Sequence, residues 1–170
     1  MKFRIYCAMS LDGFIADHNG SVGFLDAFND QDYGYKEFLT SIRTVVMGRR
    51  SYEFARTLGS WEYTGKRSII LTSQTLGSLP PEVDTTPGPV ETLAADLREH
   101  AAGDVWIMGG GAAMGAFLDA GAVDTMELYV VPVLLGRGVR LFTRSGPPVS
   151  MKLLETKKFA NGVVRTLYEK

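Results

Sequence analysis

Residues 48–51 have types that could bind a phosphate group. An apolar run over residues 44–47 ends at Gly48, and Arg49, Arg50 and Ser51 follow it directly. A helix that begins here would present free backbone N–H groups and a partial positive charge, both of which attract anions. Two guanidinium groups, and Ser51 as N-cap or hydroxyl donor, would add hydrogen bonds. An ordinary capped helix with solvated arginines explains the same residues.

Three consecutive glycines, Gly109, Gly110 and Gly111, form a second turn between an apolar run and a small-residue segment over 112–120. Without side chains they let the backbone approach a flat or charged group such as a pyrophosphate. The spacing differs from the usual dinucleotide fingerprint, whose third glycine would fall on Met114. A tight turn packed on the sheet is the alternative, and the presence of both turns in one chain favours binding.

Thr72 and Ser73 follow another apolar run and could add hydroxyl donors beside the two arginines. A carboxylate that binds the ribose 2′-hydroxyl is typical of NAD sites, and it would repel a 2′-phosphate. Arginine and hydroxyl side chains therefore favour NADPH over NADH as the cofactor.

The elements that must position these turns alternate between strand and helix. Apolar runs rich in β-branched and aromatic residues predict strands over 2–9, 44–47, 68–72, 104–108, 125–133, 151–159 and 163–169. Helical spacing is found over 33–42, 51–58, 89–101 and 112–120. This order predicts an α/β sheet with mostly parallel crossovers, and the Asn161-Gly162 pair predicts a closing antiparallel hairpin. The Pro/Gly-rich stretch 77–89 is predicted to be a surface connection, so residues 1–170 form a single domain.

Composition excludes several classes of protein. The 170 residues are 45% hydrophobic and 22% charged with a net charge of −1, which excludes a disordered chain and disfavours nucleic acid as a partner. The one cysteine, Cys7, allows no internal disulfide and no cysteine-based zinc site, and we predict no metal. The densest apolar stretch, 126–135, is about half of a membrane span, and the N-terminus lacks a signal peptide. We therefore expect a cytoplasmic protein with no membrane contact.

Five short motifs, in this order, resemble the dihydrofolate reductase-like superfamily, and above all the reductase domain of the bifunctional riboflavin-biosynthesis deaminase–reductases. They are SLDGFIA (10–16), VMGRRSYE (46–53), IILTSQ (69–74), IMGGG (107–111) and PVLLGRGVRLF (132–142). The resemblance covers nearly the whole chain. It implies a three-layer fold with a mixed, mostly parallel central sheet, flanking helices and an antiparallel C-terminal hairpin, with NADPH bound in an extended pose.

The resemblance also implies which positions contact the cofactor. The residues near the nicotinamide would be Ala8, Gly13 and Ile15. Those at the adenosine-side phosphates would be Gly48, Arg49, Arg50 and Ser51, with Thr72 and Ser73 at the 2′-phosphate. Those at the pyrophosphate would be Gly109, Gly110, Gly111 and Ala112, with Met114 packing nearby.

Asp32 is the predicted catalytic residue. Counted back from Gly48 without a gap, it falls where dihydrofolate reductases carry the carboxylate that binds the pterin and helps to protonate it. A carboxylate partly buried at a substrate cleft could donate a proton or orient an acceptor. A helix N-cap is an equally good interpretation, because a helix is predicted to follow. Tyr33 and Tyr35 could line a flat heteroaromatic pocket or pack in the core.

Departures from the superfamily pattern narrow the predicted function. Val131 stands where dihydrofolate reductases place the threonine that bonds their acid, and the deaminase signature is missing. We expect an NADPH-dependent reductase that transfers hydride to a pyrimidine- or pterin-like heterocycle or its ribosylamino sugar, like 5-amino-6-(5-phosphoribosylamino)uracil reductase. A dihydrofolate reductase is the alternative enzyme, and a non-catalytic NADP-binding sensor is the alternative of another class. The apolar C-terminal strands offer an edge for a homodimer.

Overall fold

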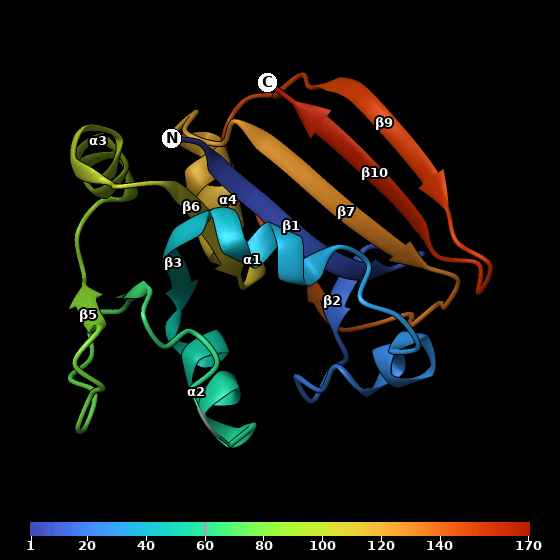
Figure 1. Ribbon diagram of the computed structural model, residues 1–170, viewed down its shortest axis with the longest axis horizontal. Coiled ribbons are helices and arrows are strands. Elements are labelled where there is room, and N and C mark those ends of the chain that lie inside the picture. The colour runs from blue at the N-terminus through green and yellow to red at the C-terminus, as the bar shows by residue number, and fades with distance from the viewer. Residues whose placement is uncertain (60) are drawn as a thin grey trace.

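The computed structural model describes residues 1–59 and 61–170, and its centre is one twisted sheet (Figure 1). Across those residues, eight strands pair in the order β5-β4-β3-β6-β1-β7-β10-β9. All pairs from β5 to β7 are parallel, and β10 and β9 continue the sheet antiparallel. The sheet therefore has the mixed, mostly parallel order that the alternation of strands and helices predicted.

The strands of this sheet are β1 (Phe3–Ser10), β3 (Ile42–Gly48), β4 (Arg67–Leu71), β5 (Val83–Thr86), β6 (Asp104–Gly109), β7 (Thr125–Val131), β9 (Lys152–Lys158) and β10 (Val164–Glu169). A separate two-stranded ribbon pairs β2 (Phe14–Ala16) with β8 (Val139–Arg140). The helices are η1 (Gly23–Phe28), α1 (Tyr35–Ser41), α2 (Arg49–Thr57), α3 (Val90–His100) and α4 (Gly111–Asp119).

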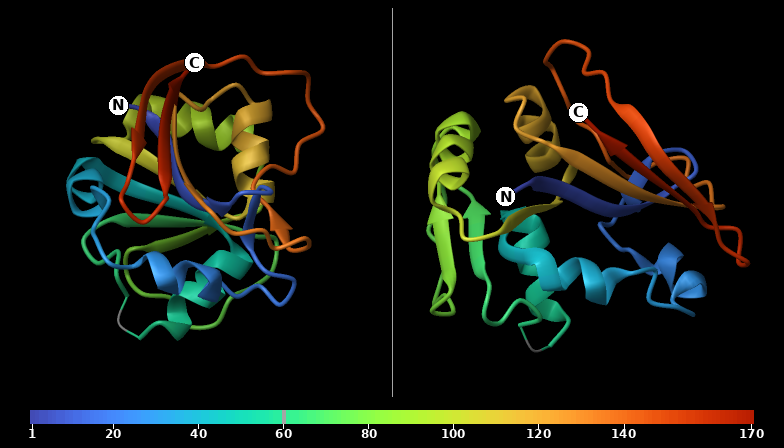
Figure 2. Two further views of the ribbon diagram at one scale, coloured as in Figure 1. Left: turned by 90° about the vertical axis from the view of Figure 1, so that its right-hand side faces the viewer. Right: turned by 45° about the horizontal axis from the view of Figure 1, so that its top comes forward.

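Helices cover both faces of the sheet because side chains of a buried parallel strand point alternately to either side. On β3, Val46 packs in the cluster that contains α3 and α4, whereas Val45 and Met47 pack in the cluster that contains α1 and α2. The left view of Figure 2 shows these two layers of helices on opposite faces of the sheet. This is the predicted three-layer arrangement.

A third cluster covers the far part of the face that α1 and α2 occupy. Its buried members come from β7 and the C-terminal hairpin, and η1 packs on them: Tyr129, Val131, Phe159 and Val163, with Phe24, Leu25 and Phe28 from η1. The segment that leads from η1 into α1 therefore runs along the outside of β1 and β7.

The C-terminal hairpin is confirmed. Gly162 has a positive φ of 88°, and the N–H of Phe159 donates to the carbonyl of Val163 at 2.9 Å across the turn. A hairpin turn needs positive φ, which glycine adopts without steric cost. The last two strands are thereby added to β7 as the edge of the sheet.

The prediction that 77–89 is only a connection is wrong. β5 lies within it and pairs parallel with β4 at the opposite edge of the sheet. Only Val83 of its four residues is buried, so the segment is too short and too polar to show strand periodicity.

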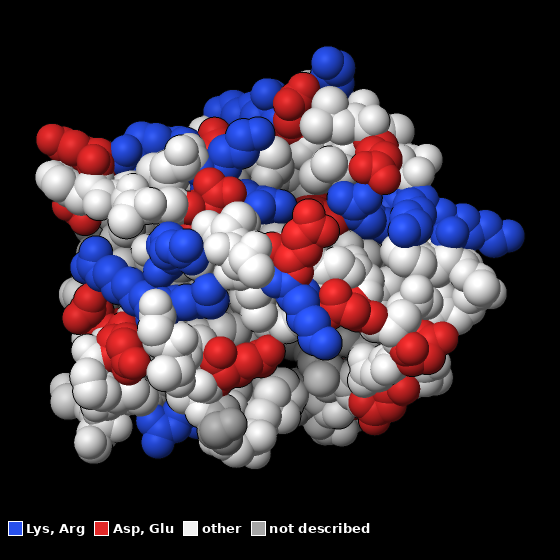
Figure 3. Space-filling model, in the orientation of Figure 1, with Lys and Arg blue, Asp and Glu red and all other residues white. Residues whose placement is uncertain are grey.

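Basic and acidic side chains are interspersed on the face shown in Figure 3, in keeping with the net charge of −1.

Among the described residues, no helix has both the length and the apolar character needed to cross a bilayer.

Candidate functional site

The topology creates a crevice between β3 and β6. These strands are parallel neighbours, with Met47 opposite Gly109. The chain leaves β3 through α2 toward β4, and it leaves β6 through α4 toward β7, on the other side. Adjacent parallel strands whose following helices diverge form the usual ligand crevice of open α/β sheets, at the carboxyl ends of the strands.

Both predicted glycine turns lie at this crevice and close to each other. A Cβ atom built on Gly48 would lie 3.8 Å from the carbonyl oxygen of Gly109 and 3.8 Å from the nitrogen of Gly110. A Cβ atom on Gly110 would lie 3.7 Å from Ser51 Oγ and 4.0 Å from Ile15 Cδ1. The structure therefore brings together residues from three of the sequence motifs.

Each turn ends in the uncapped N-terminus of a helix. Gly48 is the N-cap of α2 and Gly110 is the N-cap of α4, and neither helix has a side-chain cap hydrogen bond. The expectation that Ser51 is an N-cap is wrong, because α2 begins at Arg49 and places Ser51 inside its first turn. Ala112 lies likewise in the first turn of α4. The first N–H groups of both helices can therefore bind an anion from outside the helix.

Cationic and hydroxyl groups flank the first turn. Arg49 Nη1 contacts Glu53 Oε1 at 2.5 Å, whereas Arg50 is exposed and has no ion pair within the described part of the chain. Leu71 lies opposite Gly48 in the sheet, so Thr72 and Ser73 follow at the same edge as the arginines. The sheet register thus places these residues at one edge of the sheet, and their role around a 2′-phosphate stays a prediction.

Two predicted cofactor positions have packing roles. A Cβ atom on Gly111 would lie 2.1 Å from the carbonyl oxygen of Arg140, so only glycine fits between α4 and the end of β8. Met114 is fully buried, and its Cε lies 3.3 Å from where a Cβ atom on Gly109 would be. Gly109 itself has a φ of 146°, which other residues rarely adopt. These residues shape the second turn from the protein interior.

Asp12 fixes the loop that carries Gly13 and Ile15. Its carboxylate accepts hydrogen bonds from the Ser10 hydroxyl at 2.6 Å and from the N–H groups of Leu135 and Gly136 at 3.1 and 2.7 Å. These bonds lower the pKa of Asp12 from 3.8 to about 2, and the bond from the Ser10 hydroxyl has the largest effect. The loop is thereby held against the 132–142 segment.

Acid should weaken this connection. Because the pKa of Asp12 is lower in the folded chain, its stabilisation is complete above about pH 4 and is lost as the pH falls toward 2. We expect the urea midpoint of the wild type to fall between pH 5 and about 2.5 by more than that of Asp12→Asn. Equal falls for the two proteins would contradict this role of Asp12.

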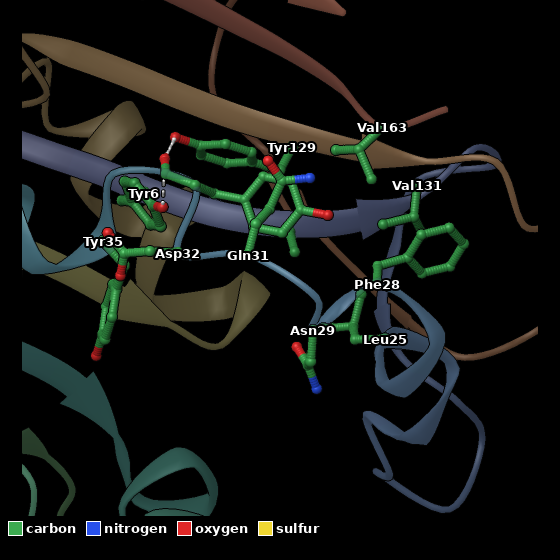
Figure 4. A pocket seen from close by; sticks show the side chains of 12 residues that line it. Tyr6, Leu25, Phe28, Asn29, Gln31, Asp32, Tyr35, Tyr129, Val131 and Val163 are labelled. Carbon is green, nitrogen blue, oxygen red and sulfur yellow. Dashed lines mark hydrogen bonds between the residues drawn. The ribbon is translucent and has the colours of Figure 1, made fainter. Parts of the chain in front are cut away.

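A cavity of about 280 Å³ opens beside the crevice, on the side of β1 and β7 (Figure 4). It is lined by Tyr6, Ala8, Leu25, Phe28, Asn29, Gln31, Asp32, Tyr33, Tyr35, Tyr129, Val131 and Val163. Ala8, implied near the nicotinamide, thus also borders the cavity. Tyr33 and Tyr35 line it, in agreement with the pocket interpretation of those residues.

Because Gly34 is the N-cap of α1, Asp32 is not the helix N-cap that was one of its two interpretations from the sequence. It lines the cavity, and its carboxylate also accepts a hydrogen bond from the backbone N–H of Lys36 at 3.3 Å in the first turn of α1. Its side chain is exposed, so the expected partial burial is wrong. Val131 contributes an apolar wall to the same cavity, where a threonine would have supplied a hydroxyl.

A hydrogen-bonded network in the cavity wall was not predicted from the sequence. The hydroxyl of Tyr129 lies 2.7 Å from the carbonyl oxygen of Tyr33 and 2.7 Å from Glu127 Oε1, and the Tyr6 hydroxyl donates to the same carbonyl at 3.4 Å (Figure 4). Tyr33 has a positive φ of 53°, which is uncommon outside glycine. Arg165 Nε binds Glu127 Oε1 at 2.5 Å.

The two hydroxyls of this network stay protonated at neutral pH. Burial raises the pKa of Tyr6 to about 12, and burial also raises the pKa of Tyr129. One signal could have revealed part of the network. Glu127 and Tyr129 are two apart on a mostly apolar strand, so they share a face.

The Glu127–Arg165 pair should matter for folding far more than a surface pair does. Their side chains are only 10% and 18% exposed, and removal of one partner leaves the other charge poorly solvated. We expect Glu127→Gln to lower the free energy of unfolding by about 2–4 kcal/mol in urea denaturation. Asp84→Asn, which breaks the half-exposed pair with Arg67, should cost less than about 1 kcal/mol. Similar small costs for both variants would contradict the structural role of Glu127.

The sequence of this protein matches a known family. The model of the RibD C-terminal domain matches residues 66–165. The chain belongs to this family. Two curated relatives come from Bacillus subtilis (strain 168). YwjB is 31% identical to this chain, and the match covers 95% of this chain and 94% of YwjB. YyaP is 27% identical, and the match covers 95% of this chain and 90% of YyaP. Both relatives are described as uncharacterized proteins.

Solved structures of the family share this architecture. A Shewanella sp. PV-4 protein, provisionally assigned to riboflavin biosynthesis, has a TM-score of 0.88 and 26% identity, with 99% of this chain and 98% of that chain covered. The Thermotoga maritima diaminohydroxyphosphoribosylaminopyrimidine deaminase/5-amino-6-(5-phosphoribosylamino)uracil reductase has a TM-score of 0.73 and 17% identity. The likeness covers 99% of this chain and 56% of that one. These likenesses confirm the predicted dihydrofolate reductase-like fold, and membership of the RibD family supports a reductase-like role.

Proposed function

We propose that the protein is an NADPH-dependent reductase that transfers hydride to a pyrimidine- or pterin-like heterocycle, or to its ribosylamino sugar. One observation carries the proposal. Both glycine turns, which lead into the N-termini of α2 and α4, lie at one crevice together with Ile15, and an aromatic cavity lies beside that crevice. A dinucleotide would match this arrangement, because it has charged phosphates in the middle and a flat reactive ring at one end.

The residues at the crevice fit NADPH. Uncapped N–H groups of the two helices would hold the pyrophosphate, and the glycines leave room for its approach. Arg50, Arg49, Thr72 and Ser73 supply donors for a 2′-phosphate at the carboxyl edge of β3 and β4. Ala8 and Ile15 would then lie beside the nicotinamide.

NADPH would supply the hydride, and the protein would bind and orient the substrate. The tyrosine rings offer flat walls for a heterocycle in the cavity, and Asn29 and Gln31 offer amide donors and acceptors. Asp32, at the same wall, would accept a hydrogen bond from a ring N–H and so orient the substrate for hydride transfer. Packing by Leu25, Phe28 and Val131 would exclude water from one side.

The test is turnover of NADPH by the purified protein with a ribosylamino-pyrimidine and with a dihydropterin, each with and without its anionic tail. Loss of NADPH absorbance with any of these compounds supports a reductase. Binding of NADPH without turnover of any of them favours the sensor alternative. Absence of NADPH binding contradicts the proposal. Val131 in the cavity disfavours the dihydrofolate reductase alternative, because no hydroxyl at that position can bond the acid.

We also propose a homodimer formed through β9. This strand is an edge of the sheet, and Leu153 and Leu154 are 49% and 45% exposed on it. Light scattering should give twice the chain mass for the wild type and the monomer mass for Leu153→Lys with Leu154→Glu. A monomeric wild type at micromolar concentration contradicts this assembly. The cytoplasmic location stays a prediction.

A further inference from the structure

The segment that builds most of the cavity wall has a charge of one sign. Residues 5–35 contain five acidic residues and neither lysine nor arginine: Asp12, Asp17, Asp26, Asp30 and Asp32. Nine of the twelve residues that line the cavity belong to this segment. The other three, Tyr129, Val131 and Val163, are uncharged at neutral pH, so none of the described residues in the lining is a cation.

No cation neutralises these carboxylates within the described part of the chain. None of the five forms an ion pair there, and Asp30 is bonded by a neutral donor, Asn161 Nδ2, at 2.8 Å. The nearest basic residues do not line the cavity: Arg4 and Arg165 are paired with Glu127, and Lys36 of α1 and Lys157 of β9 are exposed. Figure 3 shows acidic side chains over the region where Figure 1 draws η1.

The lining also limits size and shape. Four tyrosines, Tyr6, Tyr33, Tyr35 and Tyr129, contribute aromatic surface, and the two amides beside them are uncharged. A cavity of about 280 Å³ is slightly smaller than the range of about 300–1,000 Å³ that is usual for small-molecule sites. It suits one or two fused rings with short substituents.

We propose, on the basis of the proposed function, that the substrate is an uncharged or cationic nitrogen heterocycle without a phosphate or carboxylate tail. A phosphate carries almost two negative charges at neutral pH and would lie in the field of Asp26, Asp30 and Asp32 without a basic partner. Repulsion of this kind makes a site selective against anionic ligands, just as favourable contacts make it selective for the correct one. The site then differs from one built for a ribosylamino-pyrimidine phosphate or for the glutamate tail of dihydrofolate.

Two matched pairs of compounds test this inference. One pair is the ribosylamino-pyrimidine 5′-phosphate and the same nucleoside after phosphatase treatment. The other is dihydrofolate and 7,8-dihydropterin. Binding is measured by calorimetry with and without saturating NADPH, and kcat/KM is measured wherever turnover occurs. We expect the uncharged member of each pair to be favoured at least about tenfold at low salt.

Charge variants separate electrostatics from shape. Asp26→Asn with Asp30→Asn should reduce the preference by about threefold or more, since the carboxylates are lost but the hydrogen bond to Asn161 can persist. Asp84→Asn on β5, at the far edge of the sheet, removes one negative charge away from the cavity and should leave the preference unchanged.

Three results would overturn the inference: a preference for the anionic member, a preference that the double variant does not alter, or no binding of either uncharged compound. Because binding is also measured without NADPH, a protein that fails to bind NADPH would refute the proposed function and still report on the charge preference of the cavity.

Discussion

The double substitution Arg49→Ala with Arg50→Ala should weaken NADPH binding by about 10- to 100-fold or more, because each charge-assisted hydrogen bond to a phosphate contributes about 1.5–3 kcal/mol. The effect on NADH should be several-fold at most, since NADH lacks the 2′-phosphate that these guanidinium groups are proposed to bind. Isothermal calorimetry with both coenzymes measures the two changes directly.

Single substitutions show how much each arginine contributes to the loss of NADPH affinity. Arg49 already contacts Glu53, whereas Arg50 is exposed without an ion pair among the described residues, so Arg50→Ala should account for most of the loss. Arg67→Ala is a matched control, because Arg67 begins β4 at the opposite, amino end of the strand. Equal losses of NADPH and NADH affinity in the double variant would contradict the assignment of these arginines to the 2′-phosphate.

Two glycine-to-alanine substitutions should change different properties: one should weaken NADPH binding and the other should lower thermal stability. Gly48→Ala places a methyl group between the two turns, at ordinary contact distance from Gly109 and Gly110, and its φ of −76° suits any residue. We expect it to lower Tm by no more than about 3 °C and to weaken NADPH binding at least about tenfold. Gly111→Ala places a methyl group 2.1 Å from the carbonyl oxygen of Arg140, and overpacking should lower Tm by about 3–10 °C.

The pair distinguishes a cofactor cradle from a tight packing contact. Thermal denaturation and NADPH titration of both variants provide the comparison. Unchanged NADPH affinity in Gly48→Ala would show that the space between the turns is not used by the cofactor. Unchanged Tm in Gly111→Ala would show that the contact between α4 and residue 140 is not rigid.

The sequence predicted the parts of the fold that have strong local signals. The central strands are apolar on both faces, and Asn161-Gly162 is a hairpin turn with a local cause, so these features could be identified without the structure. β5 was missed because Val83 is its only buried residue, and β2 was missed because it has three residues. Elements this short are held by their neighbours, and their own residues carry little information.

The crevice was predictable to a greater extent than the cavity. Gly48 and Gly109 end buried strands, and the rule that ligands bind at the carboxyl ends of parallel strands brings them together. The role of Gly111 could not be foreseen, because the carbonyl that excludes a side chain there belongs to Arg140, distant in the sequence. The Glu127–Arg165 pair depends on the register of β7 and β10, in which Arg165 is opposite Tyr129. Register between strands so far apart is set by the packed core.

Titration of NADPH into the purified protein tests the central claim most directly. If the two glycine turns hold the phosphates of a dinucleotide, calorimetry should show saturable binding of one NADPH per chain, at least about tenfold tighter than that of NADH. The absence of binding heat with either coenzyme, over several temperatures, would contradict the account.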